Sequence, residues 1–351
     1  MEDIKTNILD LTYTDIEAYV EGIKQPKFRA QQLVNWIYKR FVFDLEQMHN
    51  LPKAFKVEID NTACMYMPKV SHVSYSKADN SYKFLLKTND DKLIEAILML
   101  DKGRATVCVS CMIGCPLGCK FCATGSQVGF IRKLTVAEIV GQVLAILQYS
   151  KDNEITNKIT NIVFMGMGEP LLNKEAVEKS IDIFTHPKCL ALSPSKISVS
   201  TSGVGEGLAD FIHKTGVRLA VSLHFTTDDL RSHYMPINKH FPIDKLIKEL
   251  QKIKLKKRDY ILIEYIMFRG INDTLHQARQ LLGVIGNLKV KINLIPYNPT
   301  ETLAEKASDE QTMNEFAQYL NNKGVFTSIR RSKGTGIDGG CGQFALKKAN
   351  S

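Results

Sequence analysis

The chain has 351 residues, of which 24% are charged and 44% hydrophobic, a composition typical of globular proteins. It has no run of roughly eighteen apolar residues that could span a bilayer, and its polar start, MEDIKTNILDL, lacks a signal-peptide pattern, so we expect a cytoplasmic protein with no membrane partner. The 46 basic and 37 acidic side chains give a net charge of +9, which favours a polyanionic partner such as nucleic acid.

Residues 1–95 are predicted to form a small, helical accessory domain. In residues 29–41 the apolar side chains recur at helical spacing, and basic residues surround them. These cations suit either a solvated helix face or a contact with RNA, and the sequence leaves both readings open. Residues 71–88 and 92–100 alternate like strands on either side of a short polar turn.

From residue 104 the pattern changes to alternating strands and helices. A capping box from Thr135 to Glu138 opens an apolar helix that runs to about residue 147, and an amphipathic helix follows Pro242. Strand-like runs occupy residues 105–110, 159–165, 196–202, 217–223, 260–268, 290–297 and 325–330. Repeated strand–helix units predict an α/β fold, and their number suits a partial (β/α)6 barrel over residues 96–330, followed by a C-terminal segment, 331–351. The active site of such a barrel lies at the carboxyl ends of its strands.

Clustered cysteines are the strongest chemical signal in the chain. Five of the eight cysteines lie between positions 108 and 122, and Cys115, Cys119 and Cys122 form a C-x-x-x-C-x-x-C motif. In a large chain without a signal peptide, such a cluster indicates metal binding or redox chemistry. Three thiolates on one tight loop can hold three irons of a 4Fe–4S cluster and leave the fourth iron open. A structural zinc would need a fourth ligand, which Cys108 or Cys111 could supply, so a non-catalytic zinc-containing RNA-binding protein remains an alternative.

This motif, together with others in the same order, resembles a known family. The segments GCPLGCKFCATG, NIVFMGMGEPLLN, ISVSTSG, SLH, MPINK, INLIPYNP and IDGGCGQ, with FRAQQLVNWIY near the N-terminus, look like the RlmN and Cfr group of radical S-adenosylmethionine (SAM) RNA adenine methyltransferases, and are closer to RlmN. The resemblance implies a radical SAM barrel, a 4Fe–4S cluster held by Cys115, Cys119 and Cys122, and SAM bound at the open iron.

The expected cofactor contacts lie at strand ends. Gly166, Gly168 and Glu169 end a strand, where glycines allow close backbone approach and a carboxylate can accept hydrogen bonds from an ammonium group. Standing alone, this segment would be an ordinary glycine-rich turn, and a lone His224 would more often be a core histidine. By resemblance the SAM contacts are Gly168, Glu169, Ser200, Ser222, Leu223, His224 and Asn298.

Two further cysteines match the catalytic thiols of the group. Cys341 lies in a glycine-flanked tail segment that would leave its thiol mobile and accessible. By resemblance Cys341 carries the methyl group, Cys108 resolves the protein–RNA adduct by forming a transient disulfide with Cys341, and Glu95 is a proton acceptor. Without the resemblance, Cys341 would be interpreted as a free cysteine in a tail and Glu95 as a surface glutamate on a strand.

The resemblance implies methylation of adenine at carbon 2 in 23S rRNA and in tRNA by a monomeric enzyme. It also implies an external, flavodoxin-like one-electron reductant, whereas Cfr-like methylation at carbon 8 is the alternative reaction. We expect the basic runs 252–258 and 330–333 to supply phosphate contacts. The chain departs from the group's pattern at Cys111, where serine is usual, and at Gly339 and Gly340, which replace alanines and should loosen the carrier loop.

Overall fold

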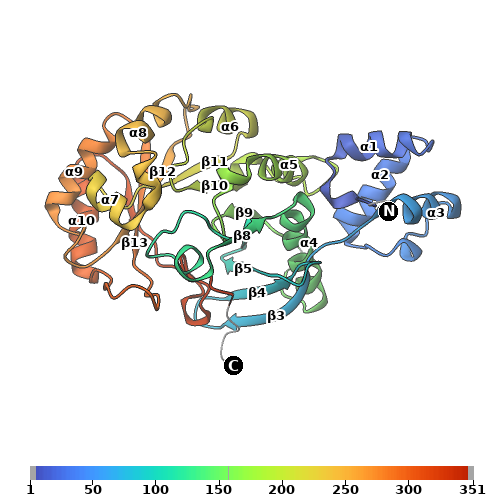
Figure 1. Ribbon diagram of the computed structural model, residues 1–351, viewed down its shortest axis with the longest axis horizontal. Helices are drawn as coiled ribbons and strands as arrows, with labels where there is room; N and C mark the ends of the chain where they lie inside the picture. Colours follow the sequence, from blue (N-terminus) through green and yellow to red (C-terminus); the bar gives the residue numbers. More distant parts are fainter. Residues whose placement is uncertain (1–4, 157, 347–351) are drawn as a thin grey trace.

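The computed structural model describes residues 5–156 and 158–346 and has a helical N-terminal part beside a large α/β barrel (Figure 1). The N-terminal part begins with a strand that pairs in parallel with β2 at the far end of the same part. Between them lie three helices and short helical turns, so the helical accessory unit expected at this end is present. Its elements are β1 (Thr6–Asn7), α1 (Tyr13–Gly22), α2 (Phe28–Asn35), α3 (Lys53–Thr62) and β2 (Ala63–Cys64).

The barrel is built on one open ten-stranded sheet of order β14-β13-β12-β11-β10-β9-β6-β5-β4-β3. Between β14 and β6 all neighbouring strands in this order are parallel, which confirms the predicted α/β barrel. The parallel strands are β6 (Arg104–Cys108), β9 (Asn161–Phe164), β10 (Ile197–Thr201), β11 (Arg218–Ser222), β12 (Ile261–Met267), β13 (Val290–Pro296) and β14 (Thr327–Ile329).

Helices connect these parallel strands. The first begins with the predicted capping box, in which Thr135 accepts from the Glu138 amide and Glu138 accepts from the Thr135 amide. It continues to Asp152, five residues beyond the expected end. The connecting helices are α4 (Val136–Asp152), α5 (Lys174–Thr185), α6 (Leu208–Thr215), α7 (Asp228–Tyr234), α8 (Ile243–Gln251), α9 (Leu275–Ile285) and α10 (Glu310–Asn322). Within the described ranges, no helix has both the length and the apolar character needed to cross a bilayer.

Three antiparallel strands extend the barrel sheet on the side of β6. They are β3 (Lys69–Ser76), β4 (Ser81–Lys87) and β5 (Leu93–Asp101), and β5 pairs directly with β6. The domain boundary expected after residue 95 therefore falls inside a strand of the barrel sheet. This extension matters for the site because Ile97 of β5 pairs with Cys108 at the carboxyl end of β6.

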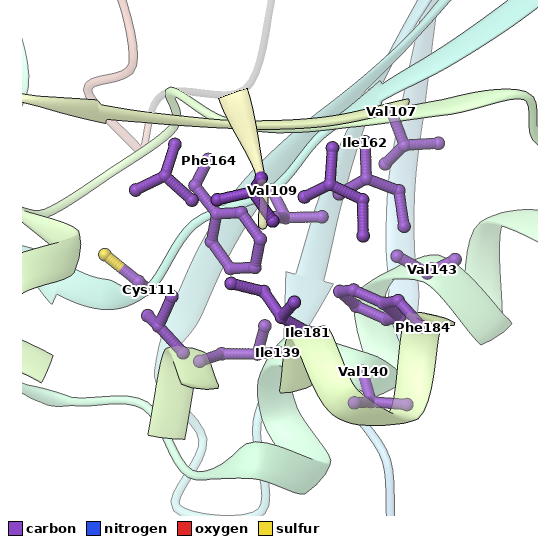
Figure 2. Close-up of a cluster of buried hydrophobic side chains, with 14 of the residues drawn as sticks. Val107, Val109, Cys111, Ile139, Val140, Val143, Ile162, Phe164, Ile181 and Phe184 are labelled. Carbon is purple, nitrogen blue, oxygen red and sulfur yellow. The ribbon is translucent and has the colours of Figure 1, made fainter. Parts of the chain in front are cut away.

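The two faces of β6 have different surroundings. Val107, Val109 and Cys111 point to the side covered by α4 and α5, where Figure 2 shows them packed with Ile139, Phe164 and Phe184. Because side chains alternate across a strand, Cys108 points to the opposite face, toward the inside of the barrel. Cys108 and Cys111 thus belong to different buried clusters, although they are only three residues apart.

The helical part is joined to the barrel by specific polar contacts. Asp10 accepts a hydrogen bond of 2.7 Å from the Ala137 amide in the first turn of α4, where the helix dipole favours a negative charge. Tyr13 stacks on His186 with 4.5 Å between ring centroids, and its hydroxyl accepts from Lys188 at 2.8 Å. These contacts fix the position of the accessory helices relative to the strand ends.

Candidate active site

The three cysteines of the motif lie on a bent loop that follows β6. The loop leaves a short strand, β7 (Met112–Gly114), which pairs with β8 (Phe130–Lys133). The Cys115 amide donates to the Gly129 carbonyl at 2.8 Å, and the Cys122 amide donates to Cys119 O at 3.1 Å. Gly114 has φ +75°, and a Cβ there would lie 1.6 Å from Gly129 O, so only glycine fits this crossing.

The three thiols line one cavity, here called the first cavity, at the carboxyl ends of the barrel strands. Burial raises the pKa of all three thiols, that of Cys115 to about 12, so they need a cationic group to become thiolates. Among the described residues, no group of three or more His, Cys, Asp or Glu side chains is arranged to hold a single metal ion. A 4Fe–4S cluster takes one thiolate per iron and does not require the sulfurs to converge on one point, so these donors fit a cluster.

Glu169 provides a buried carboxylate in the first cavity. Only 2% of the residue is exposed, and its two oxygens accept hydrogen bonds from the backbone amides of Leu171 at 3.2 Å and Ser202 at 2.8 Å. Burial raises its pKa to about 7, and these hydrogen bonds oppose the rise. Gly168, also in this cavity, has φ +99°, and a Cβ there would lie 2.6 Å from the Met112 side chain.

Three further expected SAM contacts lie in the first cavity, namely Ser200, Ser222 and His224. His224 accepts from the Ile266 amide at 3.2 Å through Nδ1, and burial lowers its pKa to about 3, so the imidazole is neutral at physiological pH. Leu223, between the last two, does not line this cavity and is buried in the core. The strand ends thus present two hydroxyls and a neutral imidazole to a bound ligand.

Cys341 lies where the first cavity meets a second one. The second cavity is lined by Cys108 and Cys341 together with Arg330, Met165 and the glycines around Cys341. Burial raises the pKa of Cys108 to about 12, whereas Cys341 is partly exposed. The fold therefore brings together the two thiols that the sequence singled out, one from the end of β6 and one from the tail.

Asn298 and Glu95 lie outside the lining of both cavities. Asn298 Nδ2 donates to Cys341 O and to Ser332 Oγ, both at 2.9 Å. Glu95 is fully buried, forms an ion pair of 2.5 Å with Lys83 and accepts from the Leu346 amide at 3.1 Å. Both side chains therefore hold the C-terminal segment that carries Cys341.

Cys111 lines neither cavity, although its sulfur lies close to Gly168. Its side chain is buried in the apolar cluster beneath the sheet (Figure 2), and its thiol donates to Met167 O at 3.6 Å. Its burial outside both cavity linings argues against Cys111 as a fourth metal ligand or as a substitute for Cys108.

Sequence reasoning missed two charged residues of the site, Glu264 and Arg330. Both line the first cavity, and their side chains form an ion pair of 3.4 Å. A single acidic residue inside the apolar strand ILIEYIM is a signal that could have indicated Glu264. Arg330 was expected to contact phosphate as part of a basic run. In the same run, Arg331 pairs with Glu310 and Lys333 donates to Leu100 O, so these side chains already have partners within the chain.

Comparison with known proteins agrees with this geometry. The family model described as Ribosomal RNA large subunit methyltransferase N-terminal domain matches residues 6–65, and the model of the Radical SAM superfamily matches residues 109–282. A solved radical SAM methyltransferase from Sphaerobacter thermophilus superposes with a TM-score of 0.88 at 33% identity, covering 97% of this chain and 100% of that one. Fold, cysteine loop and matches together define a radical SAM enzyme, a class that uses a 4Fe–4S cluster and SAM.

Relatives with similar full-length sequences indicate which family of radical SAM enzymes the chain belongs to. A protein from Vesicomyosocius okutanii named "Dual-specificity RNA methyltransferase RlmN" is 37% identical, covering 99% of this chain and 97% of its own. One of the same name from Oleidesulfovibrio alaskensis is 40% identical over 96% of this chain and 95% of its own. The chain belongs to the RlmN family.

Proposed function

We propose that this protein methylates carbon 2 of adenosine in 23S rRNA and in tRNA, as the resemblance of its motifs to RlmN implies. The observation that carries the proposal is the position of Cys341, which borders both the cavity of the cysteine loop and the cavity of Cys108. A methyl carrier that serves a cofactor on one side and a resolving thiol on the other needs this placement. The relatives named as dual-specificity RNA methyltransferases support RNA as the substrate.

The cofactors would be held by residues of the first cavity. Cys115, Cys119 and Cys122 would each hold one iron, and the carboxylate of Glu169 would receive the ammonium group of SAM. The hydroxyls of Ser200 and Ser222 and the neutral His224 orient the rest of the ligand. On one-electron reduction, the cluster and SAM together supply a 5′-deoxyadenosyl radical, the species that starts chemistry at an unactivated methyl group.

The two thiols of the second cavity divide the remaining work. Cys341 first accepts a methyl group on its sulfur and then presents that methyl to the base, since carbon 2 of adenine has no acidic proton and is a poor nucleophile. One hydrogen atom of this methyl would pass to the adenosyl radical, and the carbon left behind bonds to the ring and links the protein to RNA. The radical adduct would then return one electron to the cofactor that supplied the radical. Cys108 takes the ring proton, and its sulfur then attacks the sulfur of Cys341. The bond between that sulfur and the carbon breaks, the carbon takes up the proton that Cys108 gives up, and the methylated base leaves a disulfide behind. A two-electron reductant restores both thiols, as a reducing compartment allows.

Asn298 and Glu95 act through the position of Cys341. Asn298 fixes the backbone carbonyl of the carrier, and Glu95 fixes the tail beyond it through Lys83 and the Leu346 amide. We therefore propose that Glu95 contributes by holding the carrier segment. This differs from the proton-acceptor role that the resemblance implies.

Labelled RNA products test the proposed reaction. With SAM that carries a trideuterated methyl group, the new methyl on adenine should retain two deuteriums, because one is removed while the carbon is on Cys341. Mass spectrometry after ribonuclease digestion distinguishes 2-methyl- from 8-methyladenosine and rRNA from tRNA. Three retained deuteriums would refute the thioether route, and 8-methyladenosine would show the Cfr-like reaction.

The cluster itself needs a separate measurement. Protein reconstituted without oxygen should contain about four irons and four acid-labile sulfides per chain. Cys115→Ala, Cys119→Ala and Cys122→Ala should lose them, whereas Cys189→Ala, at a buried cysteine outside both cavities, should keep them. Stoichiometric zinc without iron uptake would favour the zinc-containing RNA-binding protein instead.

A further inference from the structure

Arg231, in α7, is the largest fully buried side chain of the described residues, and it binds only neutral oxygens. Its guanidinium donates to Ser202 O at 2.7 Å, to Asn238 Oδ1 at 2.8 Å, to Leu223 O at 3.1 Å and to Ser222 O at 3.2 Å. A buried cation without a carboxylate partner is costly unless a negative charge lies nearby. The surroundings of Arg231 therefore indicate which group offsets its charge.

The carboxylate of Asp228 is linked to Arg231 only through the side chain of Asn238. The Asn238 amide that accepts from Arg231 donates through Nδ2 to Asp228 Oδ1 at 2.9 Å. The same carboxylate oxygen accepts from the Ile243 amide at 2.9 Å, so its charge is already shared. Asp228 thus offsets the charge of Arg231 only in part.

The cysteine loop is the other part of the molecule near Arg231 that can carry negative charge. The Lys120 amide donates to Tyr234 O at the end of α7 at 3.0 Å, and Cys119 shares one buried apolar cluster with Tyr234 and Met235. Burial raises the pKa of the Cys119 thiol, and the charge of Arg231 opposes this rise. Helix α7, which carries Arg231, thus packs against the loop that would hold the cluster.

Arg231 also connects two strand ends that line the first cavity. Ser202 follows β10 and Ser222 ends β11, and the guanidinium binds the carbonyls of both. The amide of Ser202 donates to Glu169, so this residue is held on one side by Glu169 and on the other by Arg231. Loss of the guanidinium would free the strand ends that carry the expected SAM contacts.

We propose that Arg231 is a positioning residue with two effects: it fixes the ends of β10 and β11 for SAM, and its charge, which Asp228 offsets only in part, favours the reduced cluster. The inference rests on the proposed role of Cys119 as an iron ligand. Reduction adds one negative charge to the cluster, and a cation in a low-dielectric interior stabilises that charge. The reduction potential should therefore be higher with Arg231 than without it.

Two substitutions separate the two effects. In the full-length reconstituted protein, Arg231→Gln should lower the ratio of reduced to oxidised cluster about tenfold at a fixed potential, or about 59 mV for a one-electron couple. Arg231→Lys keeps the positive charge, so its midpoint potential should stay near that of the unaltered protein. It loses the planar guanidinium that donates to several carbonyls at once. Both variants should bind SAM at least fivefold more weakly. Potentiometric titration followed by electron paramagnetic resonance measures the midpoint, and equilibrium dialysis of the oxidised protein measures the affinity.

Two further variants serve as a control and as a test in which the midpoint potential should shift in the opposite direction. Arg104→Gln, at the start of β6 far from the cysteine loop, should change neither quantity. Asp228→Asn removes the carboxylate that partly offsets Arg231 and should raise the midpoint, which decides the charge effect even if Arg231→Gln does not fold. Unchanged midpoints in Asp228→Asn and Arg231→Gln would overturn the charge effect. Unchanged SAM affinity in a folded Arg231→Lys would overturn the positioning effect. If the unaltered protein takes up no iron, the proposed function fails first.

Discussion

The side-chain amide of Asn298 donates a 2.9 Å hydrogen bond to the backbone carbonyl of Cys341. A second hydrogen bond of the same length to Ser332 fixes the amide from the other side. Asn298 thus contacts the backbone of Cys341, the proposed methyl carrier, and does not line the first cavity. The contact suggests that this asparagine affects the reaction by placing Cys341.

Replacing Asn298 by alanine should therefore slow methyl transfer to RNA more than it weakens SAM binding. Loss of one partly buried hydrogen bond costs about 1 kcal/mol, so we expect transfer to fall about fivefold and SAM affinity to change less than twofold. Single-turnover transfer of labelled methyl and equilibrium dialysis measure the two. Asn153→Ala, which removes an exposed amide–carbonyl bond at the end of α4, is the matched control. Weaker SAM binding with unaltered transfer would instead favour the cofactor contact that the resemblance implies.

Cys108→Ala should trap the protein–RNA adduct. The variant keeps Cys341 and the first cavity, so it should still load the methyl group and add to adenine, but nothing then displaces the sulfur of Cys341. A species resistant to SDS and removed by ribonuclease should accumulate. Turnover at the normal rate would show that Cys108 does not resolve the adduct.

Cys111 provides the matched control for that experiment. Because its thiol is buried and lines neither cavity, Cys111→Ser should leave turnover within about twofold, and the new hydroxyl can still donate to Met167 O. Cys108→Ala combined with Cys111→Ser should trap as much adduct as Cys108→Ala alone. More adduct in the double variant would mean that Cys111 does replace Cys108.

Periodicity predicted the parallel strands well, because each is an apolar run bounded by turns and followed by a helix. It did not predict that β5 pairs with β6, since an alternating strand carries no mark of its neighbour in the sheet. The boundary expected at residue 95 therefore cuts a strand. Pairing of residues 93–101 with the barrel depends on tertiary packing that a single sequence does not encode locally.

For the site, the motifs singled out residues of the cysteine loop and of several strand ends that line one cavity in the fold, and their roles toward SAM stay predictions. The roles of Asn298 and Glu95 depend on how the tail docks, which involves contacts such as Leu346 to Glu95 between distant parts of the chain. No sequence motif indicates the role of Arg231. In the sequence, a buried arginine that binds backbone carbonyls cannot be distinguished from an exposed arginine on a helix. The loosening expected at Gly340 is opposed by its amide, which donates to Gln343 Oε1 at 3.0 Å.

Binding of SAM should strengthen as the pH rises through about 7. Burial raises the pKa of Glu169 to about 7, so below that value the carboxyl is protonated and cannot pair with the ammonium group. Between pH 6 and 8 the carboxylate forms, while His224, with its pKa lowered to about 3, stays neutral. Equilibrium dialysis across this range should show affinity rising up to about tenfold, and Glu169→Gln should abolish the dependence. An affinity that falls with pH would contradict this assignment.

The buried ion pair between Lys83 and Glu95 should contribute strongly to stability and to the placement of the tail. Lys83→Met leaves a fully buried carboxylate unpaired and should lower the free energy of unfolding by about 3–5 kcal/mol, measured by urea denaturation. The double variant Lys83→Met and Glu95→Met should recover most of this loss, because it removes both charges. Lys87→Met, at an exposed ion pair with Asp91, should cost less than about 1 kcal/mol.

The same carboxylate allows the two roles of Glu95 to be separated. Glu95→Gln keeps an oxygen for the Leu346 amide and the shape of the side chain, but it cannot take up a proton. The protein should lose stability because Lys83 loses its carboxylate, although Lys83 still donates to Asp338 O, so transfer is compared in the folded fraction. If Glu95 acts by holding the tail, single-turnover transfer should fall less than about threefold, and proteolysis of residues 331–346 should stay slow. If Glu95 is the proton acceptor, transfer should fall by two orders of magnitude or more in a fully folded protein, and the adduct should accumulate as it does in Cys108→Ala.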